Sequence, residues 1–109
     1  MADVYKNLGQ SAPSATTLTD VYTVPAATSA VVSSICVCNR SATPTTFRLS
    51  VAPGGAADAN SQYIAYDVPI GANEAWSFVE GITMATTDKL RIYAGANTLS
   101  VSAFGVEIS

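Results

Sequence analysis

The sequence predicts an all-β domain: a single β-sandwich of seven or eight antiparallel strands, immunoglobulin-like or jelly-roll-like in arrangement. Segments in which apolar and polar residues alternate recur about every ten to twelve residues, and Pro, Gly and Asn separate them. Nowhere do apolar residues recur at helical spacing over three turns. We expect residues 17–109 to form the sandwich and residues 1–16 to form an extended N-terminal arm.

The first sixteen residues hold few large apolar side chains, namely Val4, Tyr5 and Leu8, and Gly9 follows them. That is too little to build a core, and terminal segments of this composition are usually mobile unless something ties them down. We therefore expect Tyr5 and Leu8 to anchor the arm on a neighbouring subunit. The alternative is that the arm adds an edge strand to its own sandwich.

Three strands are expected in the first half of the chain, at 17–24, 30–40 and 45–51. Pro25 ends the first of them. The strand at 30–40 is apolar on both faces, which predicts a central strand covered on each side, or covered on one side by a partner chain. The strand at 45–51 shows the clearest alternation, and its inward side chains are Phe47, Leu49 and Val51.

A loop rich in Gly and small residues follows from Pro53, and the remaining strands are expected at 63–70, 74–80, 89–94 and 99–108. In the last of them the apolar positions shift phase by one residue beside Gly105. Such a shift predicts a β-bulge, or a strand that bends between the two sheets.

The composition argues against an enzyme and against a nucleic-acid partner. Charged residues make up 12% of the chain, the net charge is −3, and there is no His. An acidic chain does not attract phosphate, and His is the commonest general base and metal ligand. No nucleophile elbow, phosphate loop or metal-binding Cys motif occurs, so we expect no catalytic residue, metal or cofactor. No segment reaches the ~18 apolar residues of a membrane span, and the start lacks the features of a secretory signal, so we expect a chain made in a cytoplasm without a membrane partner.

Cys36 and Cys38 are one residue apart in the strand expected at 30–40. Neighbours on the same face of a strand lie about 6.5–7 Å apart, which is too far for a disulfide. We expect two small thiols, buried or half-buried, that are not bridged to each other. The next residues, from Asn39 to Ser41, match a glycosylation sequon, which we interpret as a chance match.

Low charge and exposed aromatic residues suggest contacts with other proteins. Tyr93 is expected on the polar face of its strand together with Lys89 and Arg91. Tyr5, Leu8, Tyr93 and Arg91 are therefore the candidate partner-contact residues. A surface with few charges does little to oppose association, so we also expect a homo-oligomer or a repeated lattice.

Segments spread over nearly the whole chain carry a resemblance to a known family: 6–10, 17–25, 31–35 with 38–40, 66–69, 81–88 and 103–108. In this order they resemble small virion structural proteins of tailed bacteriophages. The resemblance implies a β-sandwich that coats or completes a phage particle, with no catalytic residues. It further implies other virion proteins as partners, either the major capsid protein or tail proteins, and a location in the virion, assembled in the host cytoplasm.

Three functions remain open. The first is a capsid decoration (cement) protein that binds and stabilises the shell. The second is a structural or adhesion module of a tail, baseplate or fibre. The third is a carbohydrate-binding module that uses Trp76 or Tyr93 as a stacking platform. The number of copies in purified particles separates the first two, and glycan binding by the isolated domain tests the third.

Overall fold

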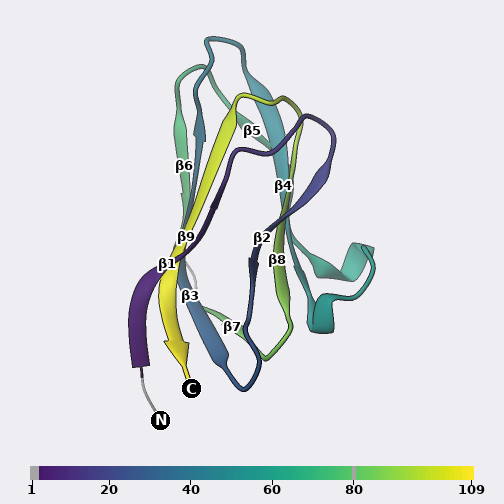
Figure 1. Cartoon of the computed structure of the whole chain (residues 1–109). Helices are drawn as coiled ribbons and strands as arrows, with labels where there is room; N and C mark the ends of the chain where they lie inside the picture. Colours follow the sequence, from purple (N-terminus) through teal and green to yellow (C-terminus); the bar gives the residue numbers. More distant parts are fainter. Residues whose placement is uncertain (1–2, 80) are drawn as a thin grey trace.

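The computed structural model describes residues 3–79 and 81–109, and within them nine strands form two antiparallel sheets (Figure 1). The strands are β1 (Asp3–Ser11), β2 (Leu18–Thr23), β3 (Ser29–Asn39), β4 (Thr45–Ala52), β5 (Tyr63–Ile70), β6 (Ala75–Phe78), β7 (Ile82–Met84), β8 (Lys89–Ala94) and β9 (Leu99–Ile108). Two short 3-10 turns, η1 (Pro53–Gly55) and η2 (Asn60–Gln62), lie between β4 and β5. None of the described residues is in an α-helix. The prediction of an all-β sandwich is confirmed.

The pairing of the strands is that of a jelly roll. The five-stranded sheet has the order β1-β9-β3-β6, with β7 also paired to β3, and the four-stranded sheet has the order β2-β8-β4-β5. The first strand thus pairs with the last, β2 with β8, β3 with β6 and β7, and β4 with β5. A long hairpin rolled up on itself gives this pattern, with its strands divided between two facing sheets.

The prediction of an N-terminal arm at residues 1–16 is wrong. Asp3–Ser11 forms β1, an edge strand that pairs antiparallel with β9. Leu8 is only 8% exposed and belongs to the protein's own core. An edge strand needs one hydrogen-bonded neighbour and few apolar side chains, because one of its faces can stay in water. The alternative prediction, an edge strand added to the chain's own sandwich, is therefore correct. Met1 and Ala2 lie outside the described residues.

β1 also closes one side of the sandwich. A Cβ at Gly9 would overlap the backbone carbonyl of Val21 in β2, so the edges of the two sheets touch at this point. Glycine is the residue that permits so close an approach of two backbones.

β3 is central as expected, lying between β9 and the pair β6 and β7, but it is not apolar on both faces. Its register with β9 shifts between Val32 and Ser34, where Ser33 is an extra residue. The bulge changes the phase of the alternation, so that Val32 and Ile35 both point into the core while Val31 stays outside. The parts of β3 before and after the bulge alternate in opposite phase. In the sequence they therefore look like one strand that is apolar on both faces.

The bulge predicted beside Gly105 exists, but the extra residues lie in the neighbours of β9 and not in β9 itself. One is in β3 and the other is in β1, where the register shifts between Asn7 and Gly9. A Cβ at Gly105 would overlap the carbonyl oxygen of Val31, so this position has to be glycine for the bulged β3 to pass. β9 therefore keeps its alternation, and its last outward positions, Phe104 among them, are apolar.

The strand expected at 74–80 is shorter in the structure. β6 covers only four residues and β7, which was not expected, covers three; both pair with β3 along the same edge. A strand of three residues is too short to show a period in sequence. Glu80, the end of the expected strand, lies outside the described residues.

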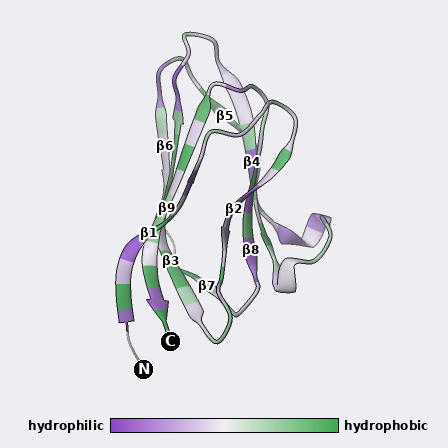
Figure 2. Ribbon diagram, in the orientation of Figure 1, coloured by the Kyte–Doolittle hydropathy of each residue, from purple (hydrophilic) through white to green (hydrophobic). Residues whose placement is uncertain are grey.

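The core fills the space between the two sheets, and the alternation along the strands is visible as bands of different hydropathy (Figure 2). Its largest fully buried side chains are Phe47, Ile35, Leu49, Ile70, Met84, Leu90, Ile92 and Leu99. Of the inward residues expected in the strand 45–51, Phe47 and Leu49 are fully buried and Val51 is partly buried against them.

Asn39 joins three loops at one end of the sandwich. It is buried, and its amide nitrogen donates to the carbonyls of Thr43, at 2.9 Å, and Gly71, at 3.1 Å. Its amide oxygen accepts from the backbone nitrogen of Ser41, at 3.1 Å, and the hydroxyl of Thr98, at 3.0 Å. All four hydrogen-bonding positions of the amide are used. These contacts give a structural reason for an asparagine at the first position of the sequon.

We expect Asn39→Ala to destabilise the fold by about 2–4 kcal/mol, because it leaves buried donors and acceptors of three loops without partners. Chemical denaturation with circular dichroism detection measures the change. Asn97→Ala is the control, since this asparagine lies in an exposed turn. Equal stability of the two variants would contradict the role given to Asn39.

Candidate functional site

The two sheets have outer faces of different chemistry, and the four-stranded sheet carries the charges. Asp20 in β2 accepts from Lys89 at 2.8 Å and from Arg91 at 3.1 Å, both in β8. The hydrogen bond from Lys89 is the main cause that holds the pKa of Asp20 below its usual value. Arg48 in β4 pairs with Asp67 at 2.7 Å. Charges that are already paired within one face offer little to a partner.

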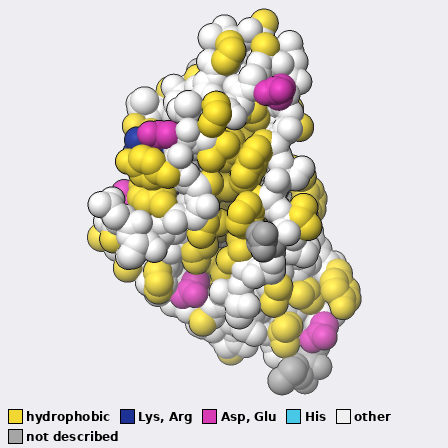
Figure 3. Space-filling model, turned by 180° about the vertical axis from the view of Figure 1, so that it is seen from behind, with side chains coloured by type: hydrophobic (Ala, Val, Ile, Leu, Met, Phe, Trp, Pro, Cys, Tyr) yellow, Lys and Arg dark blue, Asp and Glu magenta, His cyan; other side chains and the backbone are white. Residues whose placement is uncertain are grey.

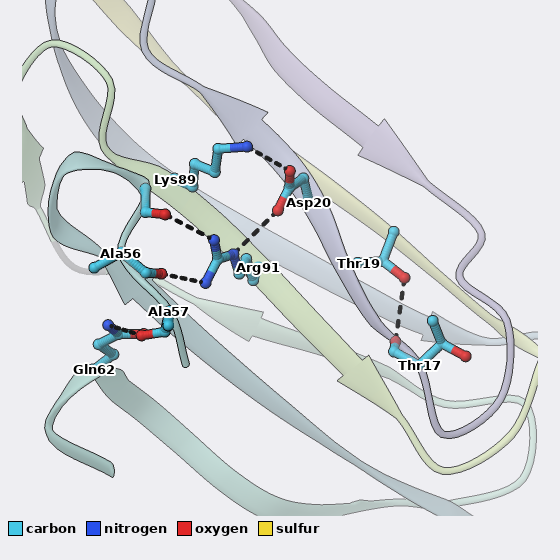
Figure 4. A network of polar contacts seen from close by, with 9 residues as sticks. Thr17, Thr19, Asp20, Ala56, Ala57, Gln62, Lys89 and Arg91 are labelled. Carbon is cyan, nitrogen blue, oxygen red and sulfur yellow. Dashed lines mark hydrogen bonds and ion pairs between the residues drawn. The ribbon is translucent and has the colours of Figure 1, made fainter. Parts of the chain in front are cut away.

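Arg91, one of the candidate contact residues, fixes a loop of its own chain (Figure 4). It donates to the backbone carbonyls of Ala56, at 2.8 Å, and Gly55, at 3.3 Å, and its side chain is only 12% exposed. The carboxylate of Asp88 accepts from the nitrogen of Gly54, at 2.8 Å, in the same loop. Arg91 therefore holds the 53–62 segment over β4 and β8.

Tyr93, another candidate, is likewise engaged inside the protein. The guanidinium of Arg48 lies 4.8 Å from the centre of its ring and 4.1 Å from that of Tyr66. The cation takes up ring surface that a ligand would otherwise use. The predicted position of Tyr93 beside Lys89 and Arg91 on the outer face of β8 is confirmed.

The outer side of the five-stranded sheet is different, and we call it the uncharged face. The outward positions of β1, β9, β3 and β6 hold no charged side chain among the described residues, apart from Asp3 at one margin. One end of this face is apolar and is formed by Tyr5, Val31, Phe104 and Val106. The other end carries small side chains: Cys36, Cys38, Ser77, Ser100 and Ser102.

A hollow of about 290 Å³ lies at the apolar end of the uncharged face. Val31, Phe104 and Val106 line it, together with Ser33 at the bulge and Gly105. Tyr5 stands at its rim and is 83% exposed. A second hollow of about 410 Å³, lined by small and polar residues, lies over the other ends of β1 and β9.

One ionic cluster closes the end of the sandwich next to the apolar hollow. Glu107 accepts from Tyr22 of the opposite sheet at 2.5 Å and from Lys6 at 3.1 Å. The hydrogen bond from Tyr22 is the largest cause of the lowered pKa of Glu107, and Lys6 adds to it. The pKa of Tyr22 is raised, first by burial and then by this carboxylate. Lys6, which also lines the hollow, is thus neutralised by Glu107.

Hydrophobic side chains are also exposed on the side of the sandwich away from β1 and β2. Figure 3 shows hydrophobic side chains running down the middle of that side, with charged groups toward its margins. Trp76 is half-buried there, edge-on to Phe47 with ring centres 4.9 Å apart and stacked on Phe78 at 5.8 Å. The ring of Trp76 is packed against the core, as expected of a core aromatic residue. Little of the ring surface is left for stacking on a sugar.

The four candidate contact residues do not form one site. Leu8 is in the core, Tyr93 and Arg91 belong to the charged face, and Tyr5 alone lies on the uncharged face. Sequence reasoning missed Val31 and Phe104 as surface residues. The apolar positions late in β9 were the available signal, but they were interpreted as a bulge.

The cysteines were also placed wrongly by sequence. Cys36 and Cys38 are both free and both exposed, on the uncharged face, where buried or half-buried thiols were expected. The bulge at Ser33 is the reason, because it turns Ile35 and Val37 inward and both cysteines outward.

Within the described part of the chain, no three Cys, Asp or Glu side chains are grouped so that they could hold a metal ion. Over the same residues, no helix has the length and apolar character needed to cross a membrane. Comparisons with family models, with curated proteins and with solved structures give no match. A function therefore has to be argued from the geometry and chemistry of the outer faces of the two sheets.

Proposed function

We propose that the protein is a structural component of a bacteriophage virion, a capsid decoration (cement) protein that binds to and stabilises the shell. The observation that carries the proposal is the uncharged face, a broad sheet surface with small side chains at one end and an apolar hollow at the other. Apolar patches of this kind on small domains mark contacts with other proteins.

The fold is compatible with this role but does not distinguish it from other functions. Jelly rolls occur in viral capsid proteins, in lectins and in cupins, so function has to be argued from the surface. The aromatic rings named as sugar platforms are occupied by their own neighbours: Trp76 by Phe47 and Phe78, and Tyr93 by Arg48. These contacts favour protein binding over carbohydrate binding.

Proteomic analysis of purified phage particles tests the proposal, followed by a reconstruction of the particle by electron cryo-microscopy. We expect the protein in many copies per particle, with density of its size on the outer surface of the shell. A few copies at one vertex or along the tail would replace the decoration role by the tail or baseplate role. Absence from washed particles would overturn both.

A further inference from the structure

The uncharged face presents no charge that would repel an identical face. The ion pairs of Asp20, Arg48 and Asp67 all lie on the outer side of the other sheet, and the uncharged face holds only Asp3 at its margin. A partner that recognises a charged surface needs groups of opposite sign, whereas a face without charge can meet an identical face without repulsion. This favours a second copy of the chain over a charged partner.

The same face is also self-complementary in shape. Tyr5 is 83% exposed and borders a hollow that is also lined by Val31, Phe104 and Gly105. A projecting aromatic ring and an apolar hollow of about 290 Å³ are thus next to each other on one surface. In a two-fold contact each surface supplies both elements to its copy, so the ring of each copy has a hollow to enter.

The size of the face is sufficient for a specific contact. Its four strand positions are about 4.8 Å apart, and β3 is 11 residues long, at about 3.3 Å per residue. The resulting footprint is on the order of 700 Å², close to the ~800 Å² that each partner buries in an interface of standard size.

We infer that the uncharged face is a two-fold interface between two copies of this chain, in which Tyr5 of each copy enters the hollow between Val31 and Phe104 of the other. The exposed edge of β1, the strand that carries Tyr5, lies beside this contact and not within it. The proposed contact with the shell uses the same face, so a copy that binds the shell would have to leave its partner copy. The inference concerns the isolated protein in solution, and it can fail while the proposed role in a virion stands.

Sedimentation velocity of the full chain at about 1 to 200 μM tests the inference. We expect the wild-type protein to be a dimer at the upper concentrations. Tyr5→Asp places a charge at the centre of each contact and is expected to raise the dissociation constant at least tenfold. The side chain of Tyr5 is exposed, so the melting temperature of the variant at monomeric concentration should stay that of the wild type.

Tyr66→Asp is the matched control, since Tyr66 is an exposed tyrosine on the outer side of the four-stranded sheet. It should leave dimerisation unchanged. A second variant, Val31→Ser, replaces an apolar residue that lines the hollow without adding charge, and it should weaken the dimer less than Tyr5→Asp does. A wild-type protein that is monomeric at 200 μM would overturn the inference, as would a Tyr5→Asp variant that dimerises like the wild type.

Discussion

Deletion of residues 1–11 is expected to unfold the protein. These residues include β1, which pairs with β9 along most of its length and supplies Leu8 to the core. Without β1, one edge of β9 has no partner strand. Glu107 also loses its ion pair with Lys6, and the close contact between Gly9 and β2 is lost. We expect a loss above about 5 kcal/mol, as large as the whole stability of many small domains. Far-ultraviolet circular dichroism of the truncated chain measures the outcome.

A pair of point variants in β1 keeps this prediction testable if the truncated chain cannot be obtained. Leu8→Ala removes a buried side chain and is expected to cost about 2–3 kcal/mol. Asn7→Ala changes an exposed neighbour and is expected to change stability by less than about 0.5 kcal/mol. A truncated chain with the melting temperature of the full protein would show that residues 1–11 form a separable arm.

Gly105→Ala is expected to be the most damaging conservative substitution, with a loss of about 3 kcal/mol or more. The added methyl group overlaps the backbone carbonyl of Val31, and backbone in the centre of a sheet cannot move aside as the end of a flexible side chain can. The change should also disturb the hollow, because Gly105 forms part of it. Urea denaturation measures the loss.

Gly81→Ala is the matched control for this substitution. A Cβ at Gly81 has no other atom within 4 Å, so the same chemical change should alter stability by less than about 0.5 kcal/mol. Similar midpoints for the two variants would show that β3 can move away from position 105 at little cost.

The sequence predicts the fold well where a strand keeps one phase and poorly where the phase changes. The alternation of Phe47 and Leu49 identifies β4 and its inward face without ambiguity. In β3, the bulge at Ser33 made one apolar face look like two and placed the cysteines inside. Whether an extra residue belongs to a strand or to its neighbour depends on the pairing, which a single sequence does not contain.

The candidate site was harder to predict than the fold. An exposed Tyr5 could be anticipated from the polar residues around it, but its neighbours Val31 and Phe104 come from strands that are remote in the chain. Leu8 was assigned to a partner because a short polar segment looked unable to join a core, although an edge strand needs to contribute only one such side chain. Arg91 and Tyr93 were correctly placed on an outer face, yet their contacts with the 53–62 loop and Arg48 depend on tertiary structure.

The rolled hairpin also determines when this protein can fold during its synthesis. β1 is synthesised before the other strands that the structure describes, but among these strands it pairs with β9. Asp3 therefore cannot pair until Ile108 has been made. The first pairing that the growing chain can complete is the one between β4 and β5, at the middle of the sequence. Assembly must then proceed outward from the centre toward both ends, and pairings between remote segments make such folding slow. Until β9 is made, β1 is an unpaired strand exposed to other nascent chains, so the yield of folded protein should depend on how quickly translation reaches its last strand.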